Sequence, residues 1–80
     1  MAVNIREKVR SVFAEVCKVD IEHLDDEVRV REELGIDSIL GLQLLARCEV
    51  ILGIEVDEAA CAELETVGQF LDYFESASGS

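Results

Sequence analysis

The chain has 80 residues, half of them hydrophobic, and a formal net charge of −11 at pH 7. This length suits one small domain, and the apolar content is too high for a disordered chain. The charge is uneven, because residues 1–31 hold six basic and seven acidic residues, whereas residues 32–80 hold eleven acidic residues and one basic residue, Arg47. Such a field repels nucleic acid and anionic membranes and attracts basic partners. We therefore expect neither a nucleic-acid-binding protein nor a membrane protein.

The N-terminus and the cysteines favour a cytoplasmic protein without a metal site. The first residues lack the apolar segment of a signal peptide, and no stretch reaches the roughly 18 apolar residues of a membrane helix. The cysteines are odd in number and have no CxxC spacing, which favours reduced thiols at Cys17, Cys48 and Cys61. The single histidine, His23, stands apart from any cysteine pair, so zinc is not expected. A calcium loop starting at residue 20 or 25 would place a leucine or an arginine at its fifth position, which excludes a full ligand set.

Residues 4–17 are predicted to form the first helix. Apolar residues recur at i, i+4, i+7, i+8 and i+11, the spacing of one helical face, at Ile5, Val9, Val12, Phe13 and Val16. Asn4 can cap the helix, and Glu7 stands three residues later, where a capping box has its acidic residue.

Residues 18–37 are predicted to be a long loop with one short turn near residues 25–28. Apolar residues are irregularly spaced between charged ones and follow neither helical nor strand periodicity for long. The segment Val28-Arg29-Val30-Arg31 alternates like a strand, but we find no partner strand in the sequence, and an isolated strand is not viable. We expect the apolar residues to pin this loop across the helix ends.

The longest apolar run predicts a second helix over residues 38–52, ending at Gly53. Asp37 is the expected cap, with Ser38 in the first turn. The helix is apolar on most sides, and so short a chain is not expected to bury it completely. We therefore expect it to present apolar surface to a partner.

Two further helices complete the predicted fold. Asp57 can cap a short helix over about residues 58–62, and Thr66 with Gln69 forms a capping box for a fourth helix. The buried stripe of that helix is predicted to be Val67, Phe70, Leu71 and Phe74. Residues 76–80 are expected to be a disordered C-terminal tail, which leaves residues 1–75 as the domain. The predicted fold class is all-α, a four-helix bundle with one short helix and a long first loop.

Ser38 is the candidate functional residue. A hydroxyl at a helix start lies near unpaired N–H groups and the positive end of the helix dipole, which favour a bound anion. Catalysis with His23 would require the long loop to fold the imidazole onto the hydroxyl, with a third group to orient it. The GxSxG motif of serine hydrolases is also missing. The serine is therefore better suited to carry a phosphodiester than to attack a substrate, and we do not expect an enzyme.

Three landmarks resemble those of acyl carrier proteins. They are the signature Leu34-Gly35-Ile36-Asp37-Ser38-Ile39 and, at similar spacings, Gly53-Ile54-Glu55-Val56 and Thr66-Val67-Gly68-Gln69-Phe70. The resemblance implies that a phosphopantetheinyl transferase attaches 4′-phosphopantetheine from coenzyme A to Ser38. The terminal thiol of this arm would hold acyl groups as thioesters for fatty acid or polyketide-type synthase enzymes. By the same resemblance Asp37 helps to orient the site and metal-bound coenzyme A, and the helix after Ser38 is the main recognition surface.

The second helix departs from the family pattern. Members that serve fatty acid synthesis usually carry acidic residues soon after the serine, whereas Leu40 and Gln43 occupy those positions here. We therefore expect a more apolar partner contact, formed by Leu40, Gln43, Leu44 and Arg47, and a specialised or polyketide-type pathway. The protein is expected to be a monomer. Two alternatives stay open: an aminoacyl or peptidyl carrier, whose serine usually follows a Gly-Gly-His/Asp pattern, and an unmodified helical interaction domain.

Overall fold

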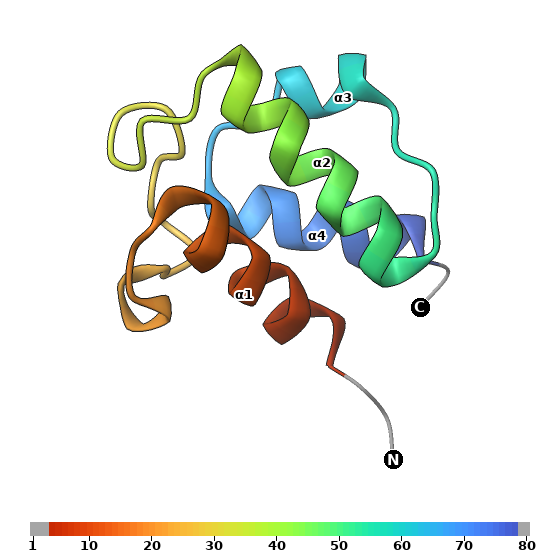
Figure 1. Cartoon of the computed structure of the whole chain (residues 1–80), viewed down its shortest axis with the longest axis horizontal. Coiled ribbons are helices and arrows are strands. Elements are labelled where there is room, and N and C mark those ends of the chain that lie inside the picture. The colour runs from red at the N-terminus through yellow and green to blue at the C-terminus, as the bar shows by residue number, and fades with distance from the viewer. Residues whose placement is uncertain (1–3, 79–80) are drawn as a thin grey trace.

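The structure, a computed structural model, describes residues 4–78 as four α-helices and one 3₁₀ helix (Figure 1). The elements are α1 (Ile5–Cys17), η1 (Ile21–His23), α2 (Ser38–Leu52), α3 (Glu58–Ala62) and α4 (Val67–Ala77). The all-α prediction is confirmed, with three longer helices, one short helix and a long connection between α1 and α2. Over residues 4–78 no helix is long and apolar enough to cross a membrane.

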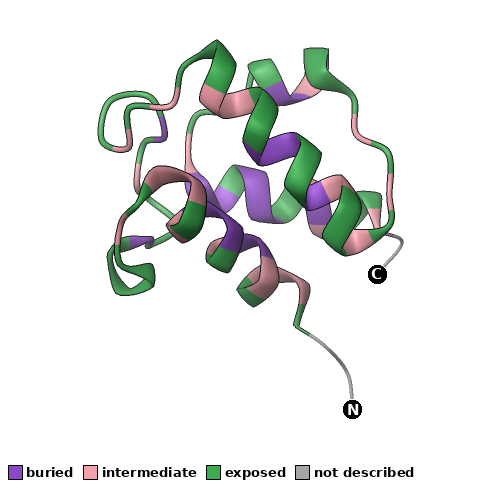
Figure 2. Cartoon of the chain, viewed as in Figure 1, coloured by how far each residue is buried: buried purple, intermediate pink, exposed green. Residues whose placement is uncertain are grey.

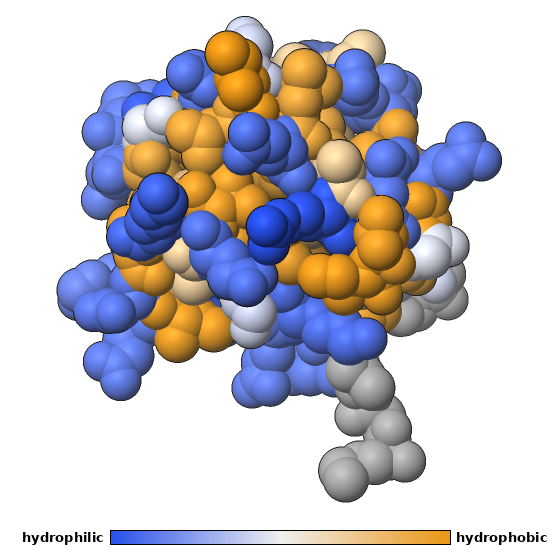
Figure 3. Space-filling model, in the orientation of Figure 1, coloured by the Kyte–Doolittle hydropathy of each residue, from blue (hydrophilic) through white to orange (hydrophobic). Residues whose placement is uncertain are grey.

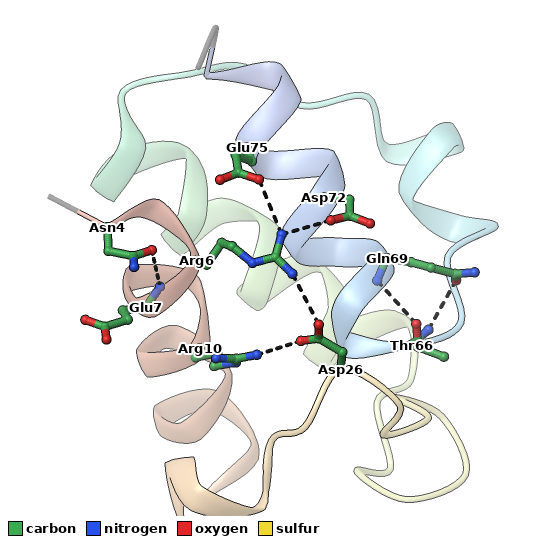
Figure 4. Close-up of polar contacts among 9 residues, drawn as sticks. All are labelled: Asn4, Arg6, Glu7, Arg10, Asp26, Thr66, Gln69, Asp72 and Glu75. Carbon is green, nitrogen blue, oxygen red and sulfur yellow. Dashed lines mark hydrogen bonds and ion pairs between the residues drawn. The ribbon is translucent and has the colours of Figure 1, made fainter. Parts of the chain in front are cut away.

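Each α-helix begins directly after the residue predicted to cap it. In every case a side-chain oxygen accepts a hydrogen bond from a first-turn backbone N–H: Asn4 from Glu7, Asp37 from Leu40, Asp57 from Ala59 and Thr66 from Gln69. The Gln69 side chain also accepts from the Thr66 backbone N–H, which completes the predicted capping box (Figure 4). These caps satisfy N–H groups that a helix leaves without partners, so they fix where each helix starts.

The core lies between α1, α2 and α4 (Figure 2). Phe13 of α1 and Phe74 of α4 are completely buried, and Phe13 packs edge-on against Phe70 with ring centroids 5.5 Å apart. The predicted stripe of α4 is buried over its whole length. Each aromatic side chain in this core removes a large apolar area from water, which makes the core the main stabilising element of so small a domain.

The connection between α1 and α2 is anchored to the start of α4. Leu24 and Val30 are both buried among core residues, as expected for apolar residues that pin a loop. Three backbone hydrogen bonds of 2.9–3.0 Å join the loop to the chain around Thr66: Gly68 to Asp26, Val67 to Val28 and Val30 to Glu65. The predicted turn is confirmed by the bond from the Val28 N–H to the Asp25 carbonyl.

The strand-like segment is a loop, as predicted, although one of its residues pairs with the cap residue of α4. Arg29 forms a single antiparallel β-bridge with Thr66. The cap residue of α4 has an extended backbone, with φ −123° and ψ 160°, so it can pair like a strand for one residue. The pairing ends there because the helix begins at the next residue.

Ion pairs add a second connection between α1, the loop and α4 (Figure 4). The Arg6 guanidinium lies 2.8 Å from Asp72, 3.3 Å from Glu75 and 3.3 Å from Asp26. Arg10 also contacts Asp26, at 2.6 Å. The hydrogen bond with Asp72 is the largest cause that raises the pKa of Arg6. Because these side chains are partly exposed, each pair contributes modestly to stability.

Helix α4 continues to Ala77, two residues into the stretch predicted as a tail. The end of this stretch, residues 79–80, lies outside the described residues.

Candidate functional site

Ser38 is the first residue of α2 and is exposed. The Asp37 side chain accepts the Leu40 N–H at 2.8 Å, and the Asp37 carbonyl accepts the Gly41 N–H at 2.8 Å. Both bonds fix the first turn of the helix, so they hold the Ser38 hydroxyl at a defined place on the surface. An accessible hydroxyl at a helix N-terminus fits a phosphodiester, because the helix end favours negative charge.

The segment before Ser38 makes a closed turn that requires a glycine. Gly35 has φ +69°, in the left-handed region that other residues rarely adopt. A side chain there would meet nothing within 4 Å, so the backbone conformation rather than the available space demands glycine. The next residue, Ile36, donates its N–H to the Val30 carbonyl at 3.0 Å, which joins the turn back to the buried part of the loop.

A cavity of about 460 Å³ opens beside Ser38. It lies among α2, α3, the first turn of α4 and the loop that precedes Ser38. Most of its lining is apolar, from Val30, Ile36, Gly41, Leu42, Leu45, Cys61, Ala62 and Phe70. Four polar residues complete it: Arg31, Asp37, Ser38 and Glu58. The arrangement places Ser38 next to an apolar hollow.

Arg31 ties the loop to the end of α3. Its guanidinium donates to the backbone carbonyl of Ala62, the last residue of α3, and at 3.3 Å to that of Leu64. Carbonyls at a helix C-terminus lack intrahelical partners, so a cationic donor is favourable there. Arg31 thereby connects two walls of the cavity. We did not predict this role from the sequence, because the contact spans more than thirty residues and leaves no local pattern.

One predicted contact residue is not on the surface. Leu44 is completely buried, so it belongs to the core and cannot contact a partner in this fold. Leu40 is half-buried, whereas Gln43 and Arg47 are exposed. Arg47 lies 3.0 Å from Glu15 of α1. Leu44 is buried because it lies on the same face of α2 as Leu45 and Cys48, and this face points toward the other helices.

The apolar surface expected on α2 is present and includes Ile51, an expected contact residue that is 43% exposed, but other residues form most of it. Ile39, Leu42 and Val50 are 69%, 51% and 82% exposed. These side chains lie on the side of the helix opposite the buried ones.

The cysteines are not suited to nucleophilic chemistry. Burial, with the neighbouring Cys61, raises the pKa of Cys48 to about 12. Burial also raises the pKa values of Cys61 and Cys17. A thiol with a raised pKa is protonated at neutral pH and reacts slowly. Residues 4–78 contain no group of three or more His, Cys, Asp or Glu side chains placed to hold a metal ion, and His23 does not line the cavity.

A helical frame with an exposed serine at a helix start fits the carrier domains that the sequence resembles. The family model described as "Phosphopantetheine attachment site" matches residues 7–74. An acyl carrier protein of Thermotoga maritima is 32% identical over 76 residues, which cover 95% of this chain and 94% of the relative. One of Saccharopolyspora erythraea is 31% identical over 69 residues, which cover 86% of this chain and 73% of the relative.

The chain therefore belongs to the acyl carrier protein family. Its cofactor is covalently attached 4′-phosphopantetheine. Proteins of this family are carriers, and they work with a phosphopantetheinyl transferase and with synthase enzymes.

Proposed function

We propose that Ser38 carries the 4′-phosphopantetheine arm and that the chain presents acyl thioesters to enzymes of fatty acid or polyketide-type synthesis. The exposed hydroxyl of Ser38 beside an apolar cavity of about 460 Å³ carries this proposal. The protein itself would be a non-catalytic, monomeric, cytoplasmic substrate of the transferase. Its three free cysteines, of which Cys48 and Cys61 are buried and Cys17 is half-buried, support a reducing setting.

Loading changes one bond on the carrier. The Ser38 oxygen forms a new bond to the phosphorus of the phosphopantetheine moiety of coenzyme A, and the pyrophosphate bond breaks. The adenosine bisphosphate leaves with the bonding electron pair, and the hydroxyl proton passes to a base of the transferase. Asp37 holds the first turn of α2 in place through its bond to the Leu40 N–H. Its position next to Ser38 supports a role in orienting metal-bound coenzyme A. Once bound, the arm supplies a thiol that exchanges acyl groups.

The lining of the cavity favours acyl cargo over aminoacyl cargo. Leu42, Leu45 and Phe70 offer apolar contact, which stabilises a hydrocarbon chain by about 25 cal/mol per Å² removed from water. An ammonium group would lose its hydration there. The departure of α2 from an acidic surface supports a specialised pathway rather than primary fatty acid synthesis, because its exposed apolar residues would meet a different kind of partner.

Intact mass spectrometry tests the attachment. The chain is incubated with coenzyme A and a broad-specificity phosphopantetheinyl transferase, and we expect a mass gain of one phosphopantetheine. Ser38→Ala should show no gain, whereas Ser11→Ala, which removes an exposed serine of α1, should load normally. No gain in the wild type, or a gain in Ser38→Ala, would contradict the proposal. Partner binding by unmodified protein that Ser38→Ala leaves unchanged would favour an interaction domain instead.

Thermal unfolding of loaded protein tests the cargo. A medium-length acyl chain that enters the cavity binds only the native state, so it should raise the melting temperature. A glycyl thioester of the same arm is the matched control and should leave it near the holo value. Equal melting temperatures for the two loaded forms would contradict the preference for acyl cargo.

A further inference from the structure

Arg31 is a cation without an anionic partner in a strongly acidic chain. Acidic residues outnumber basic ones by 18 to 7, and hydrophilic side chains are spread widely over the face shown in Figure 3. Within residues 4–78 each of the other arginines, Arg6, Arg10, Arg29 and Arg47, forms an ion pair with a carboxylate, whereas Arg31 forms none. Its charge is therefore open to an anion that the chain itself does not supply.

The guanidinium of Arg31 is held in place and still has unused donors. Its Nη1 and Nη2 atoms donate to the backbone carbonyls of Leu64 and Ala62. A guanidinium carries more N–H groups than these two contacts use, and they lie in one rigid plane that matches a carboxylate. Because the two carbonyls already fix its orientation, the side chain loses little further freedom when it binds an anion. Arg31 is also exposed, so an anion can reach it.

This cation borders the cavity beside the attachment serine. Arg31 is the only basic residue among the described residues that line the cavity, and Asp37 and Glu58 are the acidic ones. The Asp37 carboxylate is engaged by the Leu40 N–H. Glu58 is the first residue of α3 and is exposed to water, whereas Arg31 is bonded to the last residue of that helix. The cavity therefore combines mostly apolar walls with one fixed cation, away from the free carboxylate.

We propose that Arg31 binds the terminal carboxylate of a dicarboxylic acyl group carried on the arm of Ser38. The proposal rests on the function proposed above and names its cargo class. The methylene groups of such a chain gain from contact with the apolar lining. Its terminal carboxylate loses water on entering the cavity, and hydrogen bonds from a guanidinium offset that loss. A simple fatty acyl chain would use the lining but leave Arg31 without an anion.

The experiment compares two cargos that differ only in charge. An adipoyl group and its terminal carboxamide have the same length, and a broad-specificity transferase loads each onto Ser38 from the corresponding coenzyme A thioester. Melting temperatures are measured for the wild type, Arg31→Gln and Arg29→Gln. Arg31→Gln removes the charge but keeps an N–H donor for the carbonyls of α3, so it should fold. Arg29→Gln is the matched control, because Arg29 belongs to the same loop, pairs with Glu32 and does not line the cavity.

The sign of the difference between the two cargos decides the question. In the wild type the adipoyl form should melt about 4 °C or more above the carboxamide form, because an ion pair made only in the native state stabilises that state. Without a bound cation the order should reverse, since a further negative charge on a chain of charge −11 adds repulsion. Arg31→Gln should abolish or reverse the difference, and Arg29→Gln should keep it. A wild-type carboxamide form that melts as high as the adipoyl form would overturn the proposal, as would a difference that survives in Arg31→Gln.

The carboxylate supplies a second readout that a purely structural role of Arg31 would not move. With an isotopic carbon label at the terminal carboxyl, an NMR titration measures its pKa in the loaded protein. A neighbouring cation lowers this pKa, whereas the surrounding acidic chain raises it. We expect a pKa below that of free adipoyl-pantetheine in the wild type and above it in Arg31→Gln. Equal values in the two proteins would contradict the ion pair.

The arm itself contains one other anion, the phosphodiester at Ser38. If Arg31 bound that group, Arg31→Gln would shift the phosphorus NMR signal of the holo form without cargo and leave the order of the two melting temperatures unchanged. This result would overturn the assignment of a dicarboxylic cargo. Failure of the proposed function is distinct, since no loaded form of the wild type would then be obtained.

Discussion

The loop lies close against α4 at Gly68, and an alanine there should be strongly destabilising. A Cβ on Gly68 would lie 2.8 Å from the Asp26 Cβ, 3.0 Å from its carbonyl oxygen and 3.3 Å from its Cα. The obstructing atoms cannot turn aside, because two of them are backbone. The Asp26 carbonyl accepts the Gly68 N–H at 2.9 Å, and its carboxylate holds Arg6 and Arg10.

The expected loss of stability follows from the displacement of the loop that the new Cβ requires. Forcing extra volume into a packed contact costs about 1–3 kcal/mol. Displacing the loop also weakens the Gly68–Asp26 and Val67–Val28 hydrogen bonds, each contributing about 0.5–1.5 kcal/mol. We expect Gly68→Ala to lower the free energy of unfolding by about 2–4 kcal/mol in total. For a domain of this size that lowers the melting temperature by on the order of 10–20 °C.

Gly41→Ala is the matched control, because it is the same substitution inside a helix without the close approach. A Cβ on Gly41 would meet only the Ile36 Cγ2, at 3.7 Å, which is an ordinary contact. Replacing this helical glycine should raise stability by about 0.5–1 kcal/mol. Urea unfolding followed by circular dichroism measures both variants. A Gly68→Ala variant within about 0.5 kcal/mol of wild type, or a Gly41→Ala variant that is equally destabilised, would refute the packing argument.

Three further predictions address the core, the thiols and the cavity wall. Phe13→Ala should lower the free energy of unfolding by about 3–5 kcal/mol, because Phe13 is fully buried. An unchanged melting temperature would show that Phe13 does not belong to the core. Above pH 9.0 the Cys48 thiol ionises in the unfolded chain, whereas the buried thiol of the folded protein stays protonated up to about pH 12. The free energy of unfolding is therefore unaffected by this thiol below pH 9 and falls as the pH rises from 9 to 12, by up to about 1.4 kcal/mol per pH unit. The fall should be shallower in Cys48→Ala, and an equal slope would contradict it. Arg31→Ala should speed amide hydrogen exchange in residues 58–62, since it removes the side-chain bonds to Ala62 and Leu64; unchanged exchange would show that Arg31 does not hold α3.

Local patterns predicted the helix starts and the core stripe of α4. Thr66 and Gln69 cap a helix through atoms only three residues apart, so the sequence contains the whole interaction. The same holds for Asp37 and the first turn of α2, which is why Ser38 could be placed at a helix start before the structure was known. The surroundings of the Ser38 hydroxyl could not be predicted in this way. Arg31 and the cavity depend on contacts with α3 that no local spacing encodes.

The error at Leu44 has the same origin. An amphipathic helix indicates its buried face through its pattern, but α2 is apolar around most of its circumference. Only the packing of α1 and α4 decides that Leu44 faces inward while Val50, six residues later, is 82% exposed. The long loop illustrates the point again. Its apolar residues predicted anchoring, whereas the register in which Arg29 meets Thr66 is fixed by the backbone hydrogen bonds on either side, from Val67 to Val28 and from Val30 to Glu65.

The separation of charge from contact surface suits a protein that must bind and release partners in turn. Most acidic residues lie in residues 32–80, yet the exposed face of α2 formed by Ile39, Leu42, Ala46 and Val50 contains none of them. A net charge of −11 accelerates the approach of basic partners at long range without requiring ion pairs in the contact itself. Four exposed side chains cover little area compared with a stable interface of about 800 Å² per partner, so a complex formed through this face should dissociate quickly. Fast approach and fast release together suit the acyl carrier protein family, whose members work with a phosphopantetheinyl transferase and with synthase enzymes.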